Sequence, residues 1–210
     1  MEKMNSVVHL EGNRTEVTEE STFPRLVSLA AHDLRTPLAT VSGFAKTLIR
    51  AETLEEPASR YIEIIDAAAG QMVELLDEVG LAARIEDGRY QPNLREADTL
   101  ALAREAAATL GEDRVRVGGE GGTVRVDLEA TQRAVTAQAQ CALRHGGVEL
   151  VDVTATGPEL TIAPITAASA PVVLGEDLRD LGAAVAALLV RALGGSVSVD
   201  GETLHVRLPE

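Results

Sequence analysis

Residues 26–48 read LVSLAAHDLRTPLATVSGFAKTL and decide the fold of the first part of the chain. Apolar residues recur every three or four positions on both sides of His32, a spacing that predicts an amphipathic helix packed along one side. These residues are Leu26, Leu29, Ala30, Leu34, Leu38, Val41, Ala45 and Leu48. Pro37 lacks a backbone donor and crowds the turn before it, so we expect a local bend just beyond His32.

The centre of this helix is the hexapeptide HDLRTP, residues 32–37. It places an acid, Asp33, beside His32 and a hydroxyl group, that of Thr36, about one turn further on. Such a set is suited to handling protons and phosphoryl groups. A lone histidine on a helix is more often only a solvated or hydrogen-bonded side chain.

The hexapeptide in its apolar frame resembles the H-box, H-[DE]-x-x-[TN]-P, of the dimerisation and histidine-phosphotransfer (DHp) domain of bacterial sensor histidine kinases. Six consecutive matching residues favour this interpretation over that of a solvated histidine. The resemblance implies that His32 is the phosphoacceptor nucleophile. It also implies that Asp33 accepts a hydrogen bond from the far ring nitrogen and fixes the tautomer, and that Thr36 orients water when phosphate is removed from a partner.

The composition argues against several classes of protein. A net charge of -14 and a pI of about 4.7 disfavour a nucleic-acid partner, because phosphate backbones attract cations. Two Phe, two Tyr and no Trp offer no platform for stacking bases or sugars. Cys141 is the single cysteine, which excludes an intrachain disulfide and fits a reducing cytoplasm. Its commonest role would be that of a small buried thiol.

No targeting or membrane segment is visible in the sequence. The opening residues lack the apolar run of a signal peptide. The most apolar window, residues 181–190, is far shorter than the ~20 residues that a spanning helix requires. We therefore expect a soluble, cytoplasmic protein without membrane contact, whereas a typical sensor kinase carries a membrane-spanning sensor ahead of its H-box.

The chain is expected to have three parts: a polar, disordered leader over residues 1–20, a helical hairpin over 21–88 and a second domain over 89–210. The first helix should begin at a cap on Ser21 or Thr22 and run to about residue 50. The second should cover residues 58–85. Its acidic face, which we interpret as solvated, consists of Glu63, Asp66, Glu74, Asp77 and Glu78. Two helices cannot cover both apolar stripes, so we expect a homodimer built on a four-helix bundle.

The second domain is expected to be an α/β sandwich. Residues 84–107 resemble the bridge into the catalytic domain of the kinase family, with Asp98 capping a helix. Strands over 115–117 and 123–126 should follow, around a Gly-rich turn at 118–122, and then a helix over 127–145. We next expect strands over 148–154 and 159–163 and a helix over 176–193. The chain should end in a hairpin of strands 196–199 and 203–208, joined at Asp200-Gly201. The predicted fold class is thus α+β: a helical hairpin forming a dimeric four-helix bundle, then a degenerate Bergerat-type sandwich, with helices on one side of a mixed sheet, as in the GHKL family.

This second domain lacks the residues by which the resembled family binds ATP. Alignment puts Cys141 where the family has an Asn that holds Mg²⁺, and Ala137 where a second Asn is usual; neither is an oxygen ligand for Mg²⁺. Residues 160–174 read LTIAPITAASAPVVL, without the Asp and glycines of the adenine-reading motif D-x-G-x-G. The later Gly-rich box is reduced to Leu181-Gly182-Ala183. We therefore predict that the protein does not bind ATP.

The other histidines give no metal site. His145 ends a predicted helix and would favourably face its C-terminal dipole. His205 alternates with apolar residues in a strand and should point to solvent, and His9 lies in the leader. Neither His145 nor His205 has metal-ligand spacing to another His or Cys, so we predict neither a metal ion nor a cofactor held by this chain.

Three functions follow from these features. The favoured one is a histidine phosphotransferase resembling the ChpT-like type, which relays phosphoryl groups between response-regulator receiver domains through His32, the receiver supplying Mg²⁺. The second is a soluble sensor kinase that phosphorylates itself with ATP. The third is a non-catalytic adaptor that holds a regulator or a kinase. In the resembled family, partner selectivity lies around residues 40–47 and 58–65.

Overall fold

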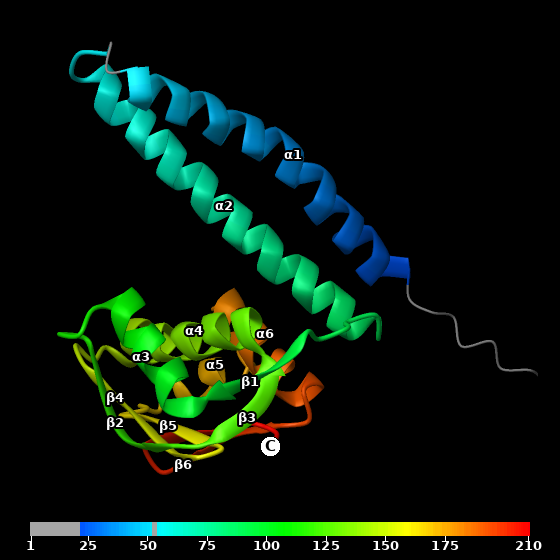
Figure 1. Ribbon diagram of the computed structural model, residues 1–210, viewed down its shortest axis with the longest axis vertical. Helices are drawn as coiled ribbons and strands as arrows, with labels where there is room; N and C mark the ends of the chain where they lie inside the picture. Colours follow the sequence, from blue (N-terminus) through cyan, green and yellow to red (C-terminus); the bar gives the residue numbers. More distant parts are fainter. Residues whose placement is uncertain (1–21, 52–53) are drawn as a thin grey trace, which may run out of the picture.

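The computed structural model describes residues 22–51 and 54–210, which form a long helical hairpin standing on an α/β domain (Figure 1). The predicted leader over residues 1–20 and the predicted cap at Ser21 lie outside the described residues. The predicted fold class is confirmed in its architecture: two helices, then a mixed sheet with helices on one side. Within the described residues, no helix combines the length and apolarity needed to cross a membrane.

The hairpin consists of α1 (Thr22–Ala51) and α2 (Ala58–Glu86), close to the predicted bounds. Helix α1 continues through Pro37 and is visibly curved (Figure 1). Small side chains such as Ala45 and Ala69 are buried, which lets two helices approach closely. A hydrogen bond of 2.7 Å from the Ser42 hydroxyl to Asp66 joins α1 to α2.

A broad apolar face of the hairpin stays uncovered in the single chain. Leu34, Val41, Met72 and Leu75 are 44 to 53% exposed. They contribute to a groove with an entirely apolar lining that also includes Pro37, Leu38 and Leu76. An exposed apolar patch of this kind is typical of a protein-interaction surface or a ligand-binding groove.

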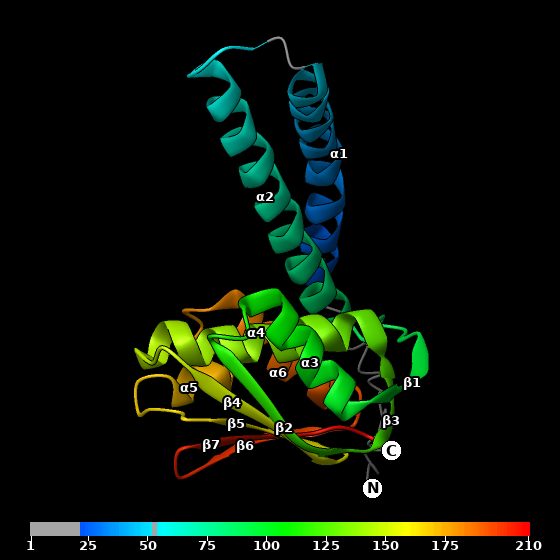
Figure 2. The same cartoon turned by 60° about the vertical axis from the view of Figure 1, so that its left-hand side comes forward.

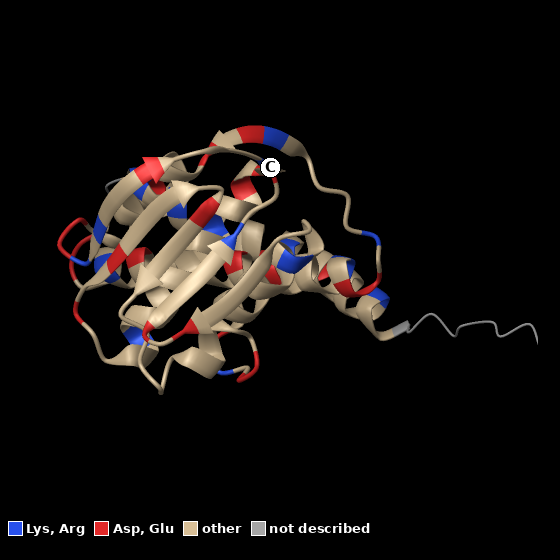
Figure 3. Cartoon of the chain, turned by 90° about the horizontal axis from the view of Figure 1, so that it is seen from below, with Lys and Arg blue, Asp and Glu red and all other residues tan. Residues whose placement is uncertain are grey.

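The α/β domain contains two sheets. Its elements are β1 (Leu94–Asp98), α3 (Thr99–Leu110), β2 (Val115–Gly121), β3 (Thr123–Asp127), α4 (Leu128–Gly146), β4 (Val151–Gly157), β5 (Glu159–Ala163), α5 (Ala170–Val173), α6 (Leu181–Ala192), β6 (Ser196–Asp200) and β7 (Thr203–Arg207). The five-stranded sheet has the order β2-β4-β5-β7-β6, in which only β2 and β4 are parallel, while β1 and β3 form an antiparallel pair. The helices cover one face of the large sheet (Figure 2), and the other face carries scattered charges of both signs (Figure 3).

Local signals explain where the helices begin. Asp98, Asp127 and Asp180 are the N-caps of α3, α4 and α6, and each carboxylate accepts a hydrogen bond from the backbone N–H three residues on. The core lies between the helices and the sheet, where Leu102 of α3 and Leu160 of β5 are buried. Alternating burial along β5 and β7 confirms that their apolar residues face the helices.

The prediction of a Gly-rich turn at residues 118–122 is wrong. Residues up to Gly121 belong to β2, which pairs in parallel with β4 and not with β3. The glycines are needed for close approach: a side chain at Gly119 would overlap the carbonyl oxygen of Ala155, and one at Gly122 would lie 2.7 Å from the backbone of Gly157.

The prediction of one helix over residues 176–193 is also wrong at its start. Helix α6 begins only at Leu181, because Asp180 has extended backbone angles and caps it. The short helix α5 was not predicted, and β4 begins at Val151 instead of residue 148. The terminal hairpin with its Asp200-Gly201 turn is confirmed, since Gly201 adopts a positive φ of 56° between β6 and β7.

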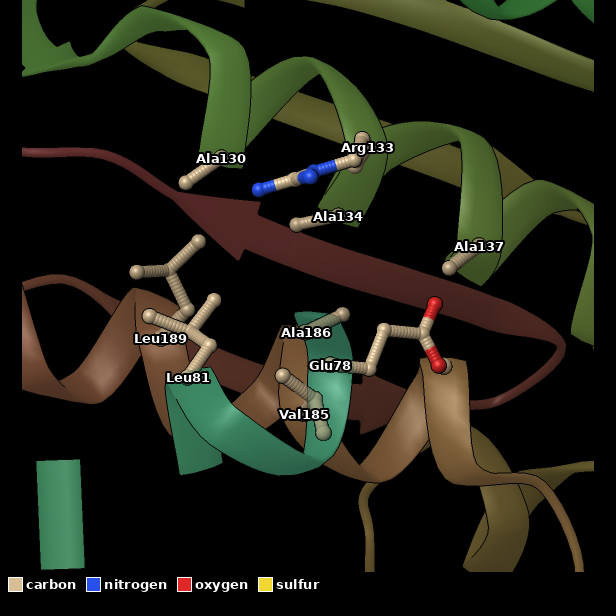
Figure 4. A pocket seen from close by; sticks show the side chains of 10 residues that line it. Glu78, Leu81, Ala130, Arg133, Ala134, Ala137, Val185, Ala186 and Leu189 are labelled. Atoms are coloured by element: carbon tan, nitrogen blue, oxygen red, sulfur yellow. The ribbon is translucent and has the colours of Figure 1, made fainter. Parts of the chain in front are cut away.

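The end of α2 packs directly on the α/β domain. Leu81 belongs to a buried cluster with Ala130 and Ala134 of α4 and Leu189 of α6. Figure 4 shows Leu81 beside Leu189, facing the two alanines of α4. Beyond α2, the Tyr90 hydroxyl donates a hydrogen bond of 2.9 Å to Asp127, the cap of α4. The hairpin and the α/β domain therefore share part of their hydrophobic core.

Candidate functional site

His32 lies on α1 with its side chain 74% exposed, beside Asp33 at 66%. The His32 Nδ1 and Asp33 Oδ1 atoms are 3.2 Å apart. When Nδ1 carries the proton and donates it to this carboxylate, Nε2 keeps its lone pair and can attack an electrophile. The structure therefore gives His32 the exposure and the hydrogen-bond partner that a nucleophile requires.

A shallow, open depression surrounds His32. Its lining consists of His32, Arg35, Thr36, Ala39 and Thr40, all from α1. His32 and Thr36 thus share one surface, while Asp33 lies at its side. Thr36 accepts, through its backbone carbonyl, a hydrogen bond of 3.2 Å from the Thr40 hydroxyl, and its own side chain is exposed. The hydroxyl is therefore accessible to a water molecule.

Arg35 is the cation of this depression, and it pairs with Asp77 of α2. The pair joins the two helices near His32. The pair could not be predicted from sequence spacing, because the two residues lie 42 positions apart. Arg35 also lies on the same surface as the imidazole, where an anionic group would experience its charge.

Comparison with known families assigns the hairpin. Residues 25–88 match the family model described as His Kinase A (phospho-acceptor) domain. Two curated proteins are similar in sequence: Sensor protein DivL of Caulobacter vibrioides, 32% identical over 84 residues, and the circadian input-output histidine kinase CikA of Synechococcus elongatus, 31% identical over 90 residues. These matches cover 39% and 42% of this chain but only 11% and 12% of the two relatives.

Solved structures show the same fold over most of the chain. Full-length ShkA, whose crystal structure is in complex with AMPPNP, superposes with a TM-score of 0.69 at 21% identity, covering 89% of this chain and 46% of ShkA. The Acinetobacter baumannii histidine kinase AdeS superposes with a TM-score of 0.51 at 16% identity, covering 85% of this chain and 97% of that one. The chain therefore has the fold of a histidine kinase DHp hairpin followed by an ATPase-like domain.

Helices α4, α5 and α6 carry or adjoin the residues at which the sequence predicts that the ATP-binding motifs are lost. The Gln138 side chain of α4 donates hydrogen bonds of 3.0 Å to the Val173 carbonyl and 3.3 Å to the Ala183 carbonyl, which tie α4 to the other two helices. A Cβ atom at Gly182 would lie 3.2 Å from the Cβ of Ala137. Helices α4 and α6 are thus in contact at Ala137 and Gly182, two of the positions where the sequence predicts that ATP-binding residues are missing.

Glu78 of α2 also lies beside Gly182, at the start of α6. Its Oε1 atom lies 3.4 Å from where a Cβ of Gly182 would be. Burial raises the pKa of this carboxyl group, and the neighbouring carboxylate of Asp180 raises the pKa further. A carboxylate at the start of α6 repels the phosphates that a helix N-terminus would otherwise attract. The sequence predicts that Glu78 lies on the second helix, but its proximity to Gly182 is visible only in the fold.

The remaining candidate histidines both have acidic partners. His145 lies in the last turn of α4, as predicted, but its Nε2 atom is also 3.2 Å from Asp180 Oδ2. His205 was predicted to point to solvent; its side chain is only 35% exposed, and its Nδ1 atom lies 2.6 Å from Glu159 of β5. These partners come from other elements, so sequence spacing could not reveal them.

Proposed function

We propose that this protein is a histidine phosphotransferase of two-component signalling, which relays phosphoryl groups between response-regulator receiver domains through His32 without using ATP. The observation that carries the proposal is a contrast within one chain. The His32–Asp33 pair is exposed and suitably hydrogen-bonded, whereas Glu78 and Ala137 lie close against Gly182, in the segment that stands for the Gly-rich box of the resembled family.

In the proposed reaction, Nε2 of His32 attacks the phosphorus of an aspartyl phosphate on the donor receiver. The P–N bond forms as the P–O bond breaks, and a free carboxylate remains on the donor. The Nδ1 proton stays in its hydrogen bond to Asp33, whose charge stabilises the phosphorylated imidazolium. An aspartate of the second receiver then attacks the phosphorus, and breaking the P–N bond restores neutral imidazole.

The other residues of the depression would position the reactants. Arg35 is held by Asp77, so its charge stays near the reacting centre without blocking His32. Thr36 would orient a water molecule if phosphate is removed from a receiver by hydrolysis. We propose that the Mg²⁺ needed for aspartyl phosphate chemistry is supplied by the receiver, because Cys141 and Ala137 are poor ligands for Mg²⁺.

We also propose a homodimer through α1 and α2. The groove between these helices is lined only by apolar side chains, and a second hairpin would cover it in a four-helix bundle. Light scattering should give twice the chain mass at micromolar concentration. A strictly monomeric species would contradict the bundle.

An ATP-dependent sensor kinase is the second candidate. It is favoured by the likeness to ShkA, which was solved in complex with AMPPNP. Calorimetry with Mg-ATP separates the two candidates: a phosphotransferase of the proposed kind gives no measurable heat of binding. Micromolar affinity for Mg-ATP, or labelling of His32 by ATP alone, would establish the kinase instead.

The decisive experiment is phosphotransfer from a labelled receiver domain of the same cell. The wild-type protein should acquire an acid-labile, base-stable label, and His32→Gln should abolish it while the dimer stays folded. His205→Gln is the matched control, since His205 also pairs with an acid but lies in the sheet. If no receiver labels the wild type while His32→Gln still binds its regulator and signals in the cell, the protein is an adaptor.

A further inference from the structure

We propose that Cys141, His145 and Asp180 form a binding site for a divalent metal ion of the zinc class. The Sγ atom, a ring nitrogen and a carboxylate oxygen of these residues all lie within 4.8 Å of one another. Thiolate, imidazole and carboxylate are the ligands that Zn²⁺ takes in proteins. This inference is independent of the phosphotransfer reaction proposed for His32.

The secondary structure brings the three ligands together. Cys141 and His145 are four positions apart on α4 and therefore lie on the same side of the helix. Asp180 immediately precedes α6, which packs along α4. The i, i+4 spacing of Cys141 and His145 is present in the sequence, which we had interpreted as lacking metal-ligand spacing; the third ligand is visible only in the fold.

Asp180 is already oriented for such a role. Its Oδ1 atom accepts a hydrogen bond of 3.1 Å from the N–H of Ala183, which caps α6 and fixes the carboxylate. Its Oδ2 atom takes no part in the cap and lies 3.2 Å from His145 Nε2. Ligand atoms around tetrahedral zinc are about 3.5 Å apart, so only the separations that approach 4.8 Å need small side-chain rotations.

The three ligands differ in exposure. The side chain of His145 is 19% exposed, whereas Cys141 and Asp180 are buried, so His145 is the ligand nearest to solvent. Metal ions bind the thiolate, so binding at the buried Cys141 must release the thiol proton, which calorimetry in buffers of different ionisation enthalpy can count.

Arg144 is the competitor for the site. Its Nη1 atom lies 3.1 Å from the same Asp180 oxygen that faces His145. In the metal-free protein this guanidinium and the imidazole share the carboxylate. A bound metal would displace the guanidinium, whose side chain is 58% exposed and can turn to solvent.

The test is titration of the full-length, tag-free protein with Co²⁺, followed by displacement with Zn²⁺. One equivalent of Co²⁺ should produce a thiolate-to-cobalt charge-transfer band in the near ultraviolet. The sequence contains a single cysteine, so within one chain such a band can come only from Cys141. Zn²⁺ should abolish the band at one equivalent and raise the melting temperature.

Variants then assign the ligands. Cys141→Ala should remove the band, and His145→Gln should weaken Co²⁺ binding by at least about 10-fold. His205→Gln, the control histidine paired with Glu159, should leave both unchanged. Arg144→Gln should bind Co²⁺ at least as tightly as the wild type, because it removes a competing cation.

Two results would overturn the site. The first is a wild-type protein that gives no thiolate band and binds neither ion in the micromolar range; the three residues would then form only the ion-pair network that caps α6. The second is a band that persists in Cys141→Ala. If either ligand variant fails to fold, the wild-type spectrum still decides.

Discussion

Replacing Leu81 by alanine tests whether the hairpin packs on the α/β domain as described. Leu81 is 7% exposed in a cluster with Leu189 and two alanines of α4. The substitution removes three buried carbon atoms, worth about 2.4 kcal/mol at ~0.8 kcal/mol each. The surrounding helices are capped and contact one another, so they can close the cavity only in part. We therefore expect Leu81→Ala to lower the free energy of unfolding by about 2–4 kcal/mol.

The assay is urea denaturation at a fixed protein concentration, because dissociation of a dimer would contribute to the measured free energy. Leu178→Ala is the matched control: Leu178 is 78% exposed, and its loss should change the free energy of unfolding by less than about 0.5 kcal/mol. If Leu81→Ala costs no more than the control, α2 does not pack on α4 and α6 in solution, and the account of the junction is wrong.

Three further predictions concern single side chains. Asp33→Asn should slow phosphotransfer by about 10²-fold in rapid-quench assays, because control of the His32 tautomer is lost. Thr36→Ala should leave transfer intact and reduce dephosphorylation of the receiver in a phosphate-release assay. Glu78→Gln should stabilise the protein at pH 7 but not below pH 4.5. The pKa of Glu78 is raised in the folded state, so the folded protein binds this proton more tightly than the unfolded chain does. The free energy of unfolding of the wild-type protein therefore falls as the pH rises above 4.5, whereas Gln carries no charge and avoids this loss. Chemical denaturation at both pH values checks this, with exposed Glu63→Gln as control.

The parts of the structure that follow from neighbouring residues could be predicted. The periodicity around His32 gave the first helix, and Asp98 and Asp127 marked the starts of α3 and α4. The Asp200-Gly201 pair gave the last turn. In each case the deciding contacts lie within one or two turns of chain, so the sequence alone contains the signal.

The parts that depend on distant residues could not. The glycines of β2 resemble a turn until β4 is known to pass beside them. Asp180 is one acid among several before α6, and only the fold shows that it caps this helix and meets His145. For the same reason Glu78 was interpreted as part of a solvated face. Long-range packing, which a single sequence does not display, placed each of these groups.

One turn of α2 connects α1, which carries His32, with the α/β domain. Asp77 pairs with Arg35 of α1, while its neighbour Glu78 contacts the start of α6 and Leu81 enters the shared core. The ion pair of Arg35 with Asp77 and the hydrogen bond from Ser42 to Asp66 both join α1 to α2 directly. Loosening the core at Leu81 should therefore destabilise the junction without removing the surroundings of His32. In the folded fraction, Leu81→Ala should still be labelled on His32 at the wild-type rate, whereas a loss of labelling would mean that the α/β domain takes a direct part in the transfer.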